Sequence, residues 1–153
     1  MKLIQIGCGH NPLSGFQNYD SDLFLFFKYI PFSEKILSLF KFIPKAFIDF
    51  IILAKKHNIH YCDASKKIPL DDNSVELIYS CHMVEHLDWN ESLSFFSESK
   101  RVLKNGGILR IVVPDFDFLI NNYKKNNDVD RFIFQSYFVG DKPKNSLKKI
   151  QYF

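Results

Sequence analysis

Three side chains close together in the sequence have the chemistry of an acid–base or metal site. His82, Glu85 and His86 stand at positions i, i+3 and i+4 in the segment HMVEHL, so they share one face if the segment is helical. An imidazole takes up and releases a proton near neutral pH, which suits His82 or His86 to act as general base for a hydroxyl nucleophile. Three interpretations stay open: this acid–base role, a divalent cation held by the two imidazoles and the carboxylate, and a structural role in capping the loop. No residue is assigned as a metal ligand.

A pair of glycines near the start of the chain indicates a binding loop. The short apolar run at residues 3–6 leads directly into Gly7 and Gly9. A strand that ends in Gly-x-Gly presents backbone N–H groups at the carboxyl edge of a parallel sheet, where a nucleotide-like ligand can approach because glycine has no side chain. A dinucleotide site of the NAD type needs a third glycine, and Pro12 stands in its place, so the pattern disfavours NAD.

Two acids end later apolar segments and fit the same kind of ligand. Asp20 ends GFQNYD, residues 15–20, and Asp63 ends IHYCD, residues 59–63; both segments are typical of short strands. At the carboxyl edge of the sheet, Asp20 is placed to accept hydrogen bonds from ribose hydroxyls, and Asp63 is suited to an adenine amino group. The three strand ends together predict a site for a nucleoside-containing cofactor.

The elements that must position these residues alternate between strand and helix. The segments at residues 75–80 and 108–115 are predicted strands, and between them Asp88 and Glu91 form a capping-box pattern that begins a helix. Leu93, Phe96 and Leu103 are expected to form its apolar stripe, and Asn-Gly-Gly at residues 105–107 to end it. Between the first two strands there is little room for a helix. The alternation predicts an α/β fold, with a parallel sheet and helices on both faces.

Residues 22–57 form a Phe-rich segment with helical spacing of apolar residues. Pro31 and Pro44 divide it, and lysines and acids interrupt it too often for a transmembrane helix. We interpret the segment as a helical lid or insertion over the cofactor cleft. The alternative is an amphipathic surface that contacts a membrane or a partner protein.

Length and composition predict one domain of 153 residues. A formal net charge of +3 is too small to indicate a nucleic-acid-binding protein, although a tail at about residues 140–153 is locally basic. The three cysteines form no C-x-x-C pair and are odd in number, which favours a reducing compartment, the cytoplasm. The amino terminus does not have the pattern of a signal peptide.

Four stretches from the start of the chain to Asp115 together resemble a known family. They read IQIGCG, GFQNYD, CDASKKIPLDDNSVELIYSCHMVEHL and RVLKNGGILRIVVPD, and they are similar to the class I S-adenosylmethionine-dependent methyltransferases, in particular the small type 11-like bacterial group. The resemblance implies a Rossmann-like parallel sheet of order 3-2-1-4-5 and S-adenosyl-L-methionine as cofactor. It implies that the glycine loop contacts the methionine part, that Asp20 holds the ribose and that Asp63 lies near adenine. The cofactor-binding residues implied are Gly7, Cys8, Gly9, Asp20, Asp63, Ala64 and Ser80.

The resemblance also implies methyl transfer to a small molecule, possibly a sugar or surface-polysaccharide precursor. The segment with His82, Glu85 and His86 is similar to the E-x-x-E-H segment of ubiquinone-type O-methyltransferases, with His82 in place of the first acid. The family's sheet has seven strands, whereas this sequence is shortened at its carboxyl end, with one helix expected at about residues 130–139 after the fifth strand. Three interpretations stay open: a shortened member of the family, a domain whose sheet edge is completed by a homodimer or another partner, and a broken gene product that binds the cofactor poorly. The alternative function is a catalytically silent cofactor-fold domain that acts as an interaction module.

Overall fold

The computed structural model describes residues 1–40 and 43–136 of the chain. The predicted basic tail at about residues 140–153 lies outside the described residues, as does the end of the helix expected at about residues 130–139. The rest of that helix is present as α5, Val129–Ser136.

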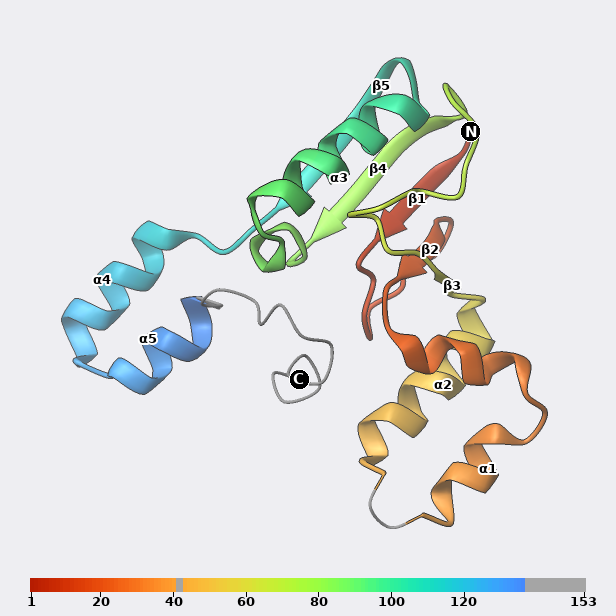
Figure 1. The fold of residues 1–153 in the computed structure, drawn as a ribbon. Helices are drawn as coiled ribbons and strands as arrows, with labels where there is room; N and C mark the ends of the chain where they lie inside the picture. The colour runs from red at the N-terminus through yellow and green to blue at the C-terminus, as the bar shows by residue number, and fades with distance from the viewer. Residues whose placement is uncertain (41–42, 137–153) are drawn as a thin grey trace.

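Five parallel strands form one sheet in the order β3-β2-β1-β4-β5 (Figure 1). The order confirms the prediction of a Rossmann-like sheet. The strands are β1 (Leu3–Ile6), β2 (Gln17–Asp20), β3 (His60–Tyr61), β4 (Val75–Cys81) and β5 (Leu103–Val112).

The register of the strands brings the predicted site residues to one edge. Ile6 on β1 is paired with Tyr19 on β2 and with Ser80 on β4. Because all strands are parallel, Gly7, Asp20 and the residues that follow β4 emerge at the same carboxyl edge. The sheet therefore brings together residues that lie more than 70 positions apart.

The connection from β1 to β2 contains no helix, as the sequence predicts, and two buried amides hold it in place. The Gln5 side chain accepts a hydrogen bond from the Leu13 N–H at 2.8 Å, and the Asn18 side chain donates to the Leu13 carbonyl at 3.1 Å. Gln5 and Asn18 are each 3% exposed, and these bonds satisfy polar groups that would otherwise be costly to bury. The short loop thus stays folded against the sheet.

Helices cover both faces of the sheet, as predicted, with two separate apolar clusters beneath them. On one face, α3 (Trp89–Val102) packs Phe95 against Ile4, Ile6 and Ile78 of the sheet. On the other face, the connection from β2 to β3 runs through η1 (Leu23–Tyr29), α1 (Ser33–Ser38) and α2 (Lys45–His57). Its buried side chains, among them Leu25, Phe50 and Ala54, pack against Cys8 and Ile59.

The last part of the predicted lid, α2, is a crossover helix between β2 and β3. In α2, Phe50, Ile51 and Ala54 are buried, so this helix belongs to the core that joins β2 to β3. Its end is marked by Asn58 in a left-handed conformation, with φ of 49°. A lid function for residues 22–57 stays a prediction.

The buried face of α3 differs from the predicted stripe. The capping box of Asp88 and Glu91 is present, but Leu93 and Phe96 are 52% and 43% exposed, and Leu103 belongs to β5. The prediction of that stripe is wrong because a helix of this composition has two apolar rows about 100° apart. The sheet selects the row that contains Phe95, Ser99 and Val102, which are buried.

The fifth strand begins earlier than predicted, at Leu103 rather than Ile108. Leu103 pairs with Val75 and Ile108 pairs with Leu77, so the intervening residues bulge out of the ladder. Gly106 takes a φ of 78° in this bulge, a conformation that suits glycine.

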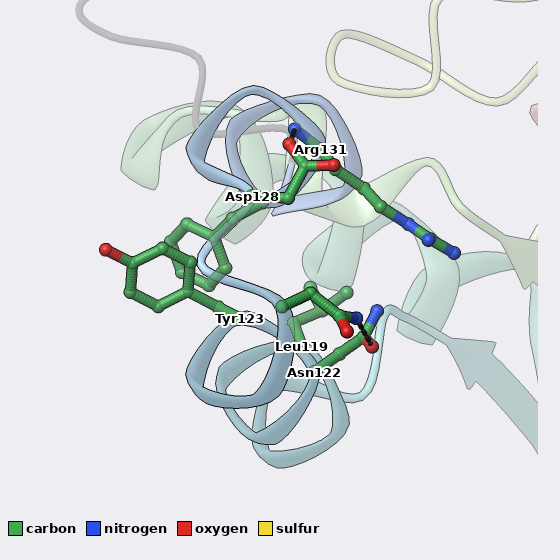
Figure 2. Close-up of a pocket in the computed structure, with 7 residues that line it drawn as sticks. Leu119, Asn122, Tyr123, Asp128 and Arg131 are labelled. Atoms are coloured by element: carbon green, nitrogen blue, oxygen red, sulfur yellow. Dashed lines mark hydrogen bonds between the residues drawn. The ribbon is translucent and has the colours of Figure 1, made fainter.

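Beyond β5, α4 (Phe116–Asn126) and α5 pack against each other and extend away from the sheet (Figure 1). The space enclosed between them has a volume of about 10 Å³, and its lining includes Leu119, Tyr123 and Arg131 (Figure 2). That volume holds about one water molecule, so the space is not a ligand site. Among the described residues, no helix is long and apolar enough to cross a membrane.

Candidate functional site

The glycine loop closes directly onto the end of β2. The backbone N–H groups of Gly7 and Cys8 both donate to the Tyr19 carbonyl, at 3.0 and 3.1 Å. The Gly9 N–H donates to the Asp20 carboxylate, Oδ2, at 2.7 Å. The loop and the acid that the sequence singled out are thus one hydrogen-bonded unit.

The two glycines of the loop have different reasons to be glycine. Both take a left-handed conformation, with φ of 70° at Gly7 and 48° at Gly9. A Cβ on Gly7 would lie 2.7 Å from the Cβ of Met83, whereas a Cβ on Gly9 would have no described atom within 4 Å. Gly7 therefore makes room for the segment after β4, and only Gly9 faces open space that a ligand can use.

Cys8 is turned away from that space. Its side chain is 3% exposed and packs with Leu25 and Phe50. Burial, together with the nearby Asp20 charge, raises the pKa of the Cys8 thiol to about 12. The thiol therefore stays protonated at neutral pH, and its role is to join the loop to the core.

Asp20 is the acid placed best to receive a ligand. Its Oδ2 accepts from Gly9 and its Oδ1 accepts from the Asp22 N–H at 3.0 Å. A carboxylate has about four lone-pair sites, so each oxygen keeps the capacity for one more donor. The neighbouring Asp22 caps η1 by accepting from the Phe24 N–H at 2.7 Å, and burial, with the Asp20 charge, raises the pKa of Asp22.

Asp63 lies at the same edge, but its carboxylate is engaged locally. It accepts from Ser65 Oγ at 2.6 Å and forms an ion pair with Lys66 at 2.8 Å. Burial raises the pKa of this carboxyl, but the bonds from Lys66 and Ser65 outweigh it and hold the pKa below its ordinary value. Because the Lys66 side chain is 79% exposed, the ion pair is weak and Asp63 can take another donor. Ala64 is buried in the core.

The segment after β4 brings two of the three predicted catalytic residues together. His82 Nδ1 lies 3.1 Å from Glu85 Oε1. His82 precedes the short helix η2 (Val84–His86) and has a φ of 52°, so the three residues do not share one helical face as predicted. Histidine, like asparagine and aspartate, adopts the left-handed conformation more readily than most residues, and here it turns the chain from β4 into η2. His86 lies at the end of η2, where its N–H donates to the Met83 carbonyl at 3.0 Å.

Two buried oxygens near this segment have no hydrogen-bond partner in the described part of the chain: Ser80 Oγ and Glu85 Oε2. Ser80 is fully buried in β4, so its side chain does not face the open edge. The Glu85 side chain is 13% exposed. Its Oε1 lies within hydrogen-bond distance of His82, and its Oε2 has no donor among the described residues. An unpaired buried carboxylate oxygen is unfavourable.

No cluster of three or more metal-binding side chains occurs among residues 1–40 and 43–136. Two other loop residues, His10 and Asp115, have structural partners. His10 packs its ring 5.1 Å from the ring of Phe50, and Asp115 caps α4 by accepting from the Phe118 N–H at 3.0 Å.

A hollow of about 390 Å³ lies at the start of β5, at the opposite edge of the sheet.

Met83 lies against Gly7 of the glycine loop, a contact that the sequence does not predict. Its close approach to Gly7 fixes the distance between the glycine loop and the His82–Glu85 pair. The Gly-x-Gly pattern predicts room for a ligand at both glycines, whereas at Gly7 the room is taken by Met83.

Comparison with known proteins gives a partial match to one sequence family and a similar fold in solved structures. Residues 45–111 match the sequence profile of a family described as "Methyltransferase domain". A search of curated proteins gave no match.

Solved structures with a similar fold were found at low sequence identity. The PH0226 protein from Pyrococcus horikoshii OT3 matches with a TM-score of 0.51 and 18% identity, over 85% of this chain and 53% of that protein. A Methanococcus maripaludis protein assigned to the S-adenosyl-L-methionine-dependent methyltransferases has 21% identity and a TM-score of 0.48, over 99% of this chain and 65% of that one. A phosphoethanolamine N-methyltransferase of Haemonchus contortus, solved with phosphomonomethylethanolamine and S-adenosylhomocysteine, has 17% identity and a TM-score of 0.48, over 99% of this chain and 31% of that one. The chain spans about half the length of the Pyrococcus protein.

Proposed function

We propose that this chain binds S-adenosyl-L-methionine and transfers its methyl group to a small acceptor. The strand order of its sheet and the match of residues 45–111 to a family described as "Methyltransferase domain" support the proposal. The observation that supports the proposal most directly is the hydrogen-bonded unit of Gly9 and Asp20. It combines open space above a glycine with a carboxylate that keeps two free lone pairs, at the carboxyl edge of a parallel sheet. S-adenosyl-L-methionine is the cofactor of the class I methyltransferases that the chain resembles.

The residues present fit such a cofactor. Asp20 is suited to accept hydrogen bonds from the two ribose hydroxyls, since its backbone donors occupy one site on each oxygen. Asp63 is suited to accept from the adenine amino group. The space above Gly9 lets the backbone of the loop approach the amino-acid part.

When bound, S-adenosyl-L-methionine supplies a methyl group on a positively charged sulfur, which is already an activated electrophile. The chain therefore has to position the acceptor and remove its proton. His82 is the group we propose for the proton. With Nδ1–H donating to Glu85 Oε1, Nε2 carries the free lone pair that takes the proton from an acceptor hydroxyl.

Glu85 is proposed to position His82. Its carboxylate fixes the imidazole tautomer and stabilises the imidazolium that forms when Nε2 is protonated. The second, unpartnered oxygen of Glu85 is suited to a hydroxyl or ammonium donor on the acceptor. A sugar hydroxyl fits this description, and a sugar or surface-polysaccharide precursor is the acceptor class we propose, on resemblance alone.

The three free cysteines support our proposal that the protein works in the cytoplasm.

Calorimetric titration of the purified chain with S-adenosylmethionine, and separately with S-adenosylhomocysteine, tests the cofactor proposal. We expect micromolar binding that Asp20→Asn weakens by about 10- to 100-fold, because hydrogen bonds to a charged group contribute about 1.5–3 kcal/mol. Asp71→Asn is the matched control, since Asp71 is an exposed acid in the turn before β4. Absence of binding by a chain with a cooperative unfolding transition would favour the silent interaction domain.

The catalytic proposal is tested once an acceptor is found among sugar hydroxyl compounds. We expect His82→Gln to lower the rate of methyl transfer by about 10²- to 10⁴-fold, the usual contribution of a positioned base, with unchanged affinity for S-adenosylmethionine. Glu85→Gln should lower the rate through His82. Equal rates in the wild type and His82→Gln would contradict the assignment.

A further inference from the structure

Two successive helical segments in the connection from β2 to β3 turn apolar rows outward. In η1, Leu23, Phe26 and Tyr29 recur every three residues, and side chains at that spacing eclipse one another in a 3₁₀-helix. Around α1, the exposed side chains are spaced i, i+4, i+7 and i+8, which is one face of an α-helix. They are Phe32, Ile36, Leu39 and Phe40.

These side chains are large and open to solvent. The two rows contain seven residues, and Ile30 between them is an eighth. These eight side chains are 47–79% exposed, and we name them the η1–α1 surface. Single exposed apolar residues are ordinary, but eight within 18 positions form a patch that is typical of an interaction surface.

Polar contacts on the inner side hold this surface in its orientation. Glu34 of α1 forms an ion pair with Lys55 of α2, which also donates to Ser33 Oγ at 3.2 Å. Ser33 Oγ in turn donates to the Phe27 carbonyl at 2.7 Å. The ion pair holds α1 against α2 on this side, and Leu25 of η1 and Leu37 of α1 are buried. The apolar rows therefore face outward.

Positive charge accompanies the apolar surface. Residues 22–57 contain six lysines and three acids, so the segment carries the whole formal net charge of the chain, +3. Lys35 Nζ lies 5.5 Å from the Phe32 ring centre. Lys28 Nζ lies 4.9 Å from the Tyr29 ring centre and also donates hydrogen bonds to Asn58 Oδ1 and the Ile59 carbonyl. Lysines that border exposed aromatic side chains are typical of helices that lie at a bilayer interface.

We propose that the η1–α1 surface binds the surface of an anionic lipid bilayer. The apolar rows enter the boundary between headgroups and acyl chains, and Lys35, which borders the Phe32 ring, contacts lipid phosphates. A protein partner is the less favoured occupant, because the net charge of the segment and the rim of lysines match an anionic surface. The surface begins with η1, which follows Asp20 after two residues. The proposal does not depend on methyl transfer.

Vesicle flotation with the full chain tests the proposal. The vesicles contain phosphatidylcholine alone or with about one third phosphatidylglycerol. We expect flotation only with the anionic vesicles, and weaker binding at high salt. The double variant Phe32→Ser and Leu39→Ser should reduce binding by about tenfold or more, because it removes two of the most exposed side chains of the surface.

The matched control is the double variant Leu93→Ser and Ile133→Ser, which removes exposed apolar side chains, 52% and 58% exposed, outside the segment. It should float as the wild type does. Circular dichroism verifies that both variants are folded. Lys35→Glu leaves the apolar rows intact and is expected to weaken binding to the anionic vesicles.

Three outcomes would overturn the proposal. The first is no flotation of the folded wild-type chain, and the second is equal loss in the control double variant. The third is a concentration-dependent dimer, seen by light scattering, that the Phe32→Ser and Leu39→Ser variant abolishes while flotation is absent. That result would assign the surface to a second copy of the chain. S-adenosylmethionine binding is measured separately and is expected to be the same in the double variant, so the two proposals can fail independently.

Discussion

Replacing each glycine of the binding loop by alanine separates the folding role of the loop from its ligand role. Both positions are left-handed, which costs an alanine about 1–2 kcal/mol. At Gly7 the new Cβ would also lie 2.6 and 2.7 Å from Met83 Cγ and Cβ, and such overpacking costs about 1–3 kcal/mol more. We therefore expect the free energy of unfolding to fall by about 1–2 kcal/mol in Gly9→Ala and by about 2–5 kcal/mol in Gly7→Ala.

Denaturant unfolding without cofactor, followed by calorimetric titration with S-adenosylmethionine, measures both roles. Gly9→Ala should keep most of its stability yet lose affinity, because its methyl group enters the open space above the loop. Gly7→Ala should lose stability first. Equal losses of unfolding free energy in the two variants would refute the assignment of Gly7 to packing, and unchanged affinity in Gly9→Ala would refute the assignment of the space above Gly9 to the ligand.

Two further predictions concern α3. Phe95→Ala should lower the free energy of unfolding by about 3–5 kcal/mol because Phe95 is fully buried, whereas Phe96→Ala, at a side chain 43% exposed, should lower it by about 1 kcal/mol or less; denaturant titration of both variants checks the assigned helix face, and the reverse order would contradict it. Glu98 accepts two hydrogen bonds from Arg101, which hold its pKa below the ordinary value of 4.5, so the folded state binds protons less readily than the unfolded chain. The ion pair therefore contributes its full stability above about pH 4.5 and loses it as the pH falls through the lower folded pKa; Glu98→Gln should flatten that part of the pH–stability profile, and an unchanged profile would contradict the role of the pair.

Local sequence determined the parts of the fold that depend on neighbouring residues. The capping box of Asp88 and Glu91 begins α3 where the sequence predicts, because both partners lie within one helical turn. The strand order was predicted because the resemblance supplied it, and the glycine pair, Asp20 and Asp63 marked the ends of the first three strands. The position of Asp20 beside Gly9 follows from the parallel pairing of β1 and β2.

Tertiary structure decided what depends on contacts between distant residues. The sequence of α3 offers two apolar rows, and only packing against Ile4 and Ile78 selects the row with Phe95. The sequence suggests one purpose for Gly7 and Gly9, and only the approach of Met83, 76 positions away from Gly7, gives them different ones. His82 and Glu85 meet through a left-handed turn rather than along a helix. In each case the local pattern permits several arrangements, and the sheet fixes one of them, because burial and steric exclusion act between segments that only the folded chain brings together.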